Sequence, residues 1–105
     1  MTTLQVLREA RESIADRDRW CSGDFALDGD GVIADPEDDA ACRRCAVGAV
    51  RFAVRDDPES RYGVIFALLD AMGPDKCALT DFNDRRGHAA VIDLFDRAIT
   101  MQEER

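Results

Sequence analysis

Apolar residues recur every three or four positions in four stretches of the chain, the spacing that places them on one face of a helix. The first stretch covers residues 2–17, where Leu7 and Ile14 share a face. Thr2 and Gln5 have the spacing of a capping box, in which each side chain satisfies a backbone donor of the other residue. The pattern therefore predicts an N-terminal amphipathic helix.

Three further helices are predicted over residues 35–54, 57–72 and 88–102. Asp-Pro dipeptides open the first two, since Asp can cap a helix and Pro suits its first turn. Gly73-Pro74 ends the second of them, because glycine supplies a left-handed cap and proline prevents continuation. Residues 75–87 are predicted to form a connector.

A β-hairpin is predicted between the first two helices. Two short apolar segments, residues 21–27 and 32–34, flank Asp28-Gly29-Asp30-Gly31. Asp and Gly tolerate the positive φ that tight turns require. The elements together predict an all-α, mainly helical fold: a compact four-helix domain with a short β-hairpin between helices 1 and 2, in which residues 1–105 form a single domain.

The same turn also has features of a calcium loop. Asp28, Asp30 and Glu37 can be aligned with ligand positions of such a loop. The first ligand position would then be Ala26, which has no side-chain oxygen. The ligand count therefore favours a plain turn over a calcium site.

The charge of the chain limits its partners. There are 22 acidic and 14 basic residues in 105, a formal net charge of −8. Such a surface repels phosphate backbones, so direct nucleic-acid binding is disfavoured and a basic protein surface is the favoured partner. No apolar run of about 18 residues predicts a membrane span. With no secretory signal in the sequence, we expect a cytoplasmic protein with reduced thiols.

Small residues dominate the segment CRRCAVGA, residues 42–49. Gly48 lies within the predicted second helix, where glycine costs about 1 kcal/mol relative to alanine. Its presence predicts that another backbone segment or a bulky ring comes close to it, with Trp20 or Phe95 as the candidate ring. Cys45 would then be a small buried residue of the same face.

The cysteines offer two further interpretations. Cys21, Cys42, Cys45 and Cys77, with His88 as a substitute, could ligate zinc. Zinc ribbons have two closely spaced cysteine pairs, whereas this chain has one, so no metal is expected. A redox pair is also disfavoured, because Cys42 would lie well inside a helix rather than at its N-terminus. No cofactor is expected.

A catalytic interpretation uses Cys45 as nucleophile, His88 as base, and Asn83 or Asp84 to orient the base. The alternative is that Cys45 and His88 are packing residues. Asn83-Asp84 has two interpretations as well: a turn or helix cap, or a ligand-facing polar pair beside Trp20 or Phe82.

The motifs LREARESIADRDRW, DPEDDAACRRCAVGAV and FNDRRGHAAVIDLFDRAI occur in an order that resembles a domain-of-unknown-function family of small bacterial and phage proteins, the DUF6197 type. The resemblance covers nearly the whole chain and implies no known activity. Arg44 stands where the family's pattern has an aromatic residue, and Cys21 and Cys42 fall outside the pattern. The matching positions are Trp20, Cys45, Ala46, Gly48, Ala49, Asn83 and Asp84.

We therefore expect a small, acidic, non-catalytic protein-binding or regulatory domain. The phage association of the resemblance would make a host or defence protein its target. The alternative is a hydrolase or transferase that uses Cys45 and His88. The expected partner-binding residues are Trp20, Asp28, Asp30, Asp35, Glu37, Asp38, Asn83 and Asp84.

Overall fold

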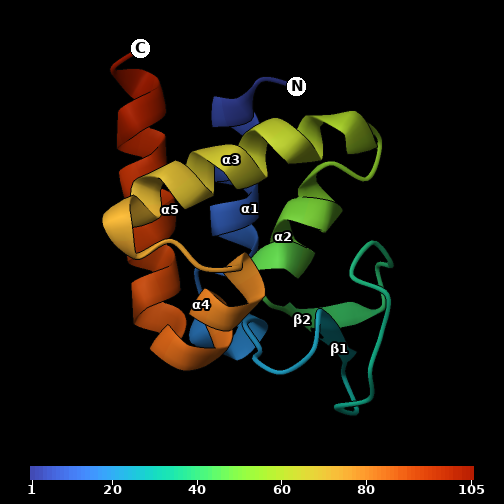
Figure 1. Cartoon of the computed structure of the whole chain (residues 1–105). Coiled ribbons are helices and arrows are strands. Elements are labelled where there is room, and N and C mark those ends of the chain that lie inside the picture. Colours follow the sequence, from blue (N-terminus) through green and yellow to red (C-terminus); the bar gives the residue numbers. More distant parts are fainter.

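Five α-helices and a two-stranded antiparallel sheet make up the fold (Figure 1), which a computed structural model describes for residues 1–105. None of the helices is both long enough and apolar enough to cross a bilayer. The elements are α1 (Thr3–Ser13), β1 (Ala26–Asp28), β2 (Ala41–Arg44), α2 (Ala46–Ala53), α3 (Arg61–Met72), α4 (Leu79–Arg86) and α5 (His88–Glu103), with short 3-10 turns at Arg17–Arg19, Pro58–Ser60 and Gly73–Asp75.

The helices pack around α1, which contacts α2, α3 and α5. In Figure 1, α3 crosses in front of α1 and α5, and the sheet lies at the end of the molecule where α4 is found. One core of 20 buried residues joins all five helices. Its largest fully buried apolar side chains are Phe95, Leu7, Ile14, Leu68, Leu94, Val6, Val50, Val64 and Val91.

The predicted N-terminal capping box is confirmed. The Thr2 hydroxyl accepts a hydrogen bond from the Gln5 amide at 3.1 Å, and the Thr2 amide donates to Gln5 Oε1 at 2.8 Å. The helix ends at Ser13, before the predicted end at residue 17, and a 3-10 turn leads to Trp20. The first helix therefore begins where the sequence predicts, at Thr3 after the Thr2 cap.

The predicted helix over residues 35–54 is wrong in its first half. Asp35 and Asp38 each accept a hydrogen bond from the amide two residues further on, at 2.9 Å, so both side chains stabilise turns. Residues 41–44 then form β2, and α2 begins only at Ala46 with Cys45 as its N-cap. Asp caps turns and helices by the same hydrogen bond to a nearby amide, which explains the error.

The predicted hairpin is present in a short form, since the Ala34 amide donates to the Ala26 carbonyl at 3.0 Å. The Asp28 amide donates to the Val32 carbonyl at 2.8 Å, and Leu27 forms an isolated bridge with Ile33. The sequence did not predict the longer pairing of β1, which is antiparallel to β2 with Ala26 opposite Arg44. Residues 29–40 therefore form a long connection between the two strands.

The predicted connector contains α4, so the domain has five helices rather than four. Leu79, Phe82 and Asn83 have helical spacing and are all buried. Only two of these three are apolar, and the remaining residues of α4 are largely polar, which hides the periodicity. Gly87, with φ of +87°, separates α4 from α5 in a conformation that favours glycine.

Candidate binding site

A buried hydrogen-bond network centred on Asn83 ties the sheet region to the helices. Asn83 Oδ1 accepts from the Trp20 indole at 2.8 Å and from the Ala46 amide at 2.9 Å. Its Nδ2 donates to the Cys21 carbonyl at 3.1 Å and to Asp84 Oδ1 at 3.0 Å. Asn83 is completely buried and uses both its oxygen and its nitrogen twice, so it offers no free group to a ligand.

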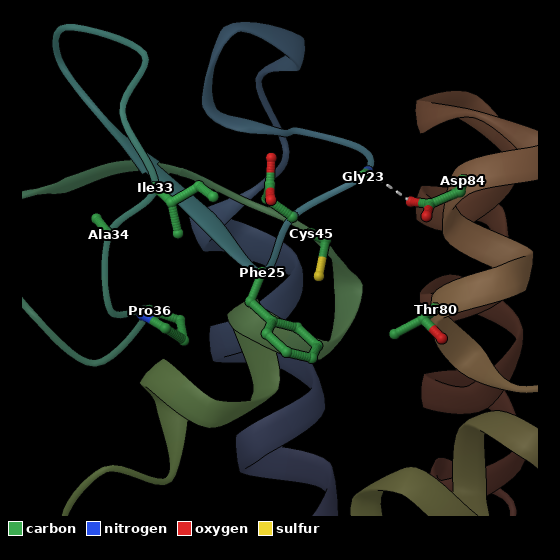
Figure 2. Close-up of a pocket in the computed structure, with 9 residues that line it drawn as sticks. Gly23, Phe25, Ile33, Ala34, Pro36, Cys45, Thr80 and Asp84 are labelled. Carbon is green, nitrogen blue, oxygen red and sulfur yellow. Dashed lines mark hydrogen bonds between the residues drawn. The ribbon is translucent and has the colours of Figure 1, made fainter.

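Asp84 continues this network to the surface. Its Oδ1 also accepts from the Gly23 amide at 2.9 Å, the contact drawn as a dashed line in Figure 2. Gly23 adopts a φ of +86°, which brings the loop back toward α4. The second oxygen, Oδ2, makes no hydrogen bond within the protein. Asp84 is therefore a carboxylate fixed at one oxygen and free at the other.

A pocket of about 240 Å³ lies between this loop and α4. In Figure 2, Phe25 and Pro36 approach it from the sheet side, Thr80 and Asp84 face it from α4, and the sulfur of Cys45 points into the space between Phe25 and Thr80. One side is thus apolar, and the other carries the carboxylate of Asp84 beside the methyl group of Thr80. The lining residues are Gly23, Asp24, Phe25, Ile33, Ala34, Pro36, Cys45, Thr80 and Asp84.

The acidic residues are concentrated beside this pocket, in the segment we call the acidic lobe, residues 20–42. The lobe contains seven Asp and Glu residues and no Lys, Arg or His. The rest of the chain contains 15 acidic and 14 basic residues, which nearly cancel. Almost the whole net charge of −8 therefore lies in the lobe. Four of the seven carboxylates have structural contacts, since Asp28, Asp35 and Asp38 accept amide hydrogen bonds and Glu37 pairs with Arg51 at 3.1 Å.

The other three carboxylates, Asp24, Asp30 and Asp39, make no hydrogen bond or ion pair. Exposed apolar side chains lie among them: Ile33 is 71% exposed and Val32 is 60% exposed. Phe25, at the mouth of the pocket, is 45% exposed. An exposed apolar group among unpaired charges is typical of an interaction surface.

Arg44 holds the lobe in place, and its role was missed from the sequence. The side chain is only 8% exposed, and its guanidinium donates to the carbonyls of Pro36 at 2.7 Å and Asp38 at 3.0 Å. It stacks on the Phe52 ring at 3.7 Å, and burial lowers the pKa of the guanidinium. The flat guanidinium occupies the position where the resemblance leads one to expect an aromatic ring. The mismatch between Arg44 and the family's pattern was the only feature of the sequence that pointed to this role.

The structure does not assemble the predicted catalytic group. Cys45 is 3% exposed, and its sulfur accepts a hydrogen bond from the Gly48 amide at 3.3 Å. His88 Nε2 instead lies 2.7 Å from the Ile14 carbonyl, and its ring packs against Trp20 at 5.7 Å. No hydrogen bond joins Cys45, His88, Asn83 and Asp84 in the order that catalysis would require.

The four cysteines do not converge on a metal site either. No group of three or more His, Cys, Asp or Glu side chains is arranged to hold a metal ion. Cys42 is exposed on β2, whereas Cys21 and Cys45 are buried, and Cys77 precedes α4. All four are free thiols, and the cysteines considered as possible zinc ligands do not lie together.

The cysteines should differ sharply in reactivity. Burial raises the pKa of Cys21 to about 11 and also raises the pKa of Cys45, so both should stay protonated and unreactive near neutral pH. Iodoacetamide followed by peptide mass spectrometry should find exposed Cys42 alkylated first, and Cys21 and Cys45 only after denaturation. Rapid alkylation of Cys45 in the folded protein would contradict this assignment and restore the nucleophile hypothesis.

Residues 1–101 match the model of a family described as a family of unknown function, DUF6197. Neither a curated protein nor a solved structure matches the chain.

Proposed function

Because the chain belongs to this family of unknown function, we propose its role from its own surface: it is a non-catalytic binding module whose acidic lobe holds a basic segment of a partner protein. One observation carries the proposal, namely that residues 20–42 account for seven of the eight net negative charges. The exposed side chains of Val32 and Ile33 would be covered by the same partner.

Charge and apolar area would have separate roles in such a complex. Unpaired carboxylates on a partner-facing surface accelerate encounter with a basic segment and exclude acidic competitors. Burial of the exposed parts of Val32, Ile33 and Phe25 would supply affinity, at about 25 cal/mol per Å² of apolar surface removed from water. The same charge disfavours nucleic acid as the partner.

Arg44 and the Asp turns support this proposal, because they hold the lobe in one conformation. A loop that is already ordered loses less conformational entropy when a partner binds. A phage origin, a host or defence protein as the target, and a cytoplasmic location stay predictions that rest on the resemblance and on the composition.

The charge of the lobe can be removed without touching its turns. The lobe variant Asp30→Asn/Asp39→Asn neutralises two unpaired carboxylates, and the control variant Asp56→Asn/Glu104→Gln removes two exposed charges elsewhere. With a dye-labelled peptide rich in Arg and Lys, fluorescence anisotropy should show about three- to tenfold weaker binding for the lobe variant, as expected for losing two exposed charge contacts. The control variant should bind like the wild type.

Salt should reproduce the effect in the unaltered protein. Between about 0.1 M and 1 M salt the Debye length falls from about 10 Å to 3 Å, so the peptide affinity should fall strongly. Equal losses in the lobe variant and the control variant would show that net charge alone attracts the peptide. That result, or an affinity that does not change with salt, would overturn the proposal.

A further inference from the structure

The pocket beside Phe25 has the chemistry of a receptor for one basic side chain. Its sheet-side wall is apolar, through Phe25, Ile33 and Pro36. The residues of its lining that have oxygen-bearing side chains are Asp24, Thr80 and Asp84. Long basic side chains have the same division, because their aliphatic stems pack on apolar surface while the charged end seeks acceptors.

We propose that this pocket receives a single arginine side chain of the partner, with its stem on Phe25 and Pro36 and its guanidinium at Asp84. This inference rests on the proposed function, since it names the residue that the acidic lobe would select. The pocket, rather than the acidic residues alone, fixes where that residue binds.

Asp84 is prepared for this role by its existing hydrogen bonds. Oδ1 is held by the Gly23 amide at 2.9 Å and by Asn83 Nδ2 at 3.0 Å, while Oδ2 is free. In Figure 2 the methyl group of Thr80, one helical turn earlier on α4, points toward Phe25, and its oxygen points away. A guanidinium has five N–H donors in a flat fork, so one of its edges can donate to the free Oδ2 while the stem lies along Phe25.

The size and lining of the pocket favour one side chain over a cofactor. About 240 Å³ is below the roughly 300–1,000 Å³ of pockets that hold small molecules. The Cys45 thiol that faces the pocket is buried and neutral, so it adds no charge of its own. Arg51 lies over the Phe25 ring at 5.7 Å, and its charge is paired with Glu37 at 3.1 Å.

Arginine is favoured over lysine because this part of the protein already binds guanidinium groups on rings. Arg44 stacks on Phe52 at 3.7 Å and Arg55 lies over the same ring at 4.2 Å. The partly exposed ring of Phe25 offers a comparable surface at the mouth of the pocket. A lysine ammonium could reach Asp84 but would lack the flat face.

Two variants separate the pocket from the general charge of the lobe. Thr80→Phe fills the pocket without changing the charge, and Asp84→Asn removes the charge while keeping an oxygen for Gly23 and Asn83. Each should weaken the arginine- and lysine-rich peptide about tenfold, the effect of one lost charge-assisted hydrogen bond. Replacing the arginines of that peptide by citrulline, which has the same shape without the charge, should cancel the difference between the wild type and Asp84→Asn.

A measurement on the unaltered protein avoids any question of whether the variants fold. In ¹⁵N-resolved NMR spectra, N-acetylarginine amide should shift the amide signals of Gly23, Cys45 and Thr80, and N-acetylcitrulline amide should not. The pocket inference is overturned if neither compound shifts them, or if both variants bind the peptide like the wild type while the lobe variant is weakened. If only the lobe variant is weakened, the proposed function still stands and the pocket inference fails. If the lobe variant binds the peptide normally, the proposed function and the pocket inference both fail.

Discussion

Replacing Asn83 by alanine should lower the free energy of unfolding by about 3–5 kcal/mol, the range seen when a buried hydrogen-bond network is broken. The substitution removes the acceptor of the Trp20 indole and the Ala46 amide, and the donor to the Cys21 carbonyl. Leaving a buried polar group without a partner costs about 1–3 kcal/mol. Three groups lose a partner here, and water that enters the new cavity would offset part of their combined cost.

The loss should be a large fraction of the total, because domains of this kind are stable by only about 5–15 kcal/mol. Urea denaturation with linear extrapolation measures it. The matched control is Asp81→Asn on the same helix, where the side chain is exposed and makes no hydrogen bond. A change below about 1 kcal/mol for Asn83→Ala would mean that the network contributes little to stability.

The second large effect is expected at Gly48. A Cβ atom at this position would collide with the carbonyl oxygen of Phe25 and lie 3.1 Å from the carbonyl carbon. That oxygen already accepts the Cys45 amide at 3.1 Å, so the Phe25 backbone cannot move without breaking this contact. Gly48→Ala should therefore destabilise the domain by about 2–4 kcal/mol, somewhat above the usual cost of overpacking because the obstacle is backbone.

Helix propensity alone predicts the opposite sign, since alanine is favoured over glycine by about 1 kcal/mol within a helix. Gly63→Ala in α3 is the matched control. There the nearest atom to the new Cβ would be the Thr3 hydroxyl oxygen at 3.3 Å, on a side chain that can rotate. Thermal unfolding should show Gly63→Ala close to the wild type and Gly48→Ala far below it. Equal melting temperatures would contradict the close approach at Gly48.

The close approach at Gly48 was predicted from the sequence, but its neighbour was not. A glycine inside a helix indicates that something lies near, and the structure confirms that. The sequence left two kinds of neighbour open, another backbone segment or a ring such as Trp20 or Phe95, and the structure shows the backbone of Phe25. Backbone contacts leave no side-chain signal, so only the structure could identify this one.

The elements that were predicted well are those whose apolar face is long. The helices α1, α3 and α5 each bury several apolar residues at helical spacing. Residues 35–44 were misassigned because Asp35 and Asp38 close turns by the hydrogen bond that also caps helices. Strand β2 gave no alternating pattern, since one of its buried positions is Arg44.

The Asn83-Asp84 pair was recognised as important, with its role left open between structure and ligand binding. The structure divides the two roles between the two residues. Asn83 is buried and satisfied, and it holds Trp20 and the start of α2. Asp84 reaches the pocket with one free oxygen. Two adjacent polar residues on a helix point in different directions, which the sequence alone cannot assign to inside and outside.

The most direct test of the binding surface is an NMR titration of the ¹⁵N-labelled protein with the arginine- and lysine-rich peptide. We predict shifted amide signals in the acidic lobe and at Thr80 and Asp84, and unshifted signals on the outer face of α3, where Tyr62 and Phe66 are exposed. Shifts on that face with an unchanged lobe, or no shifts anywhere, would contradict the assignment of the acidic lobe as the site of partner binding.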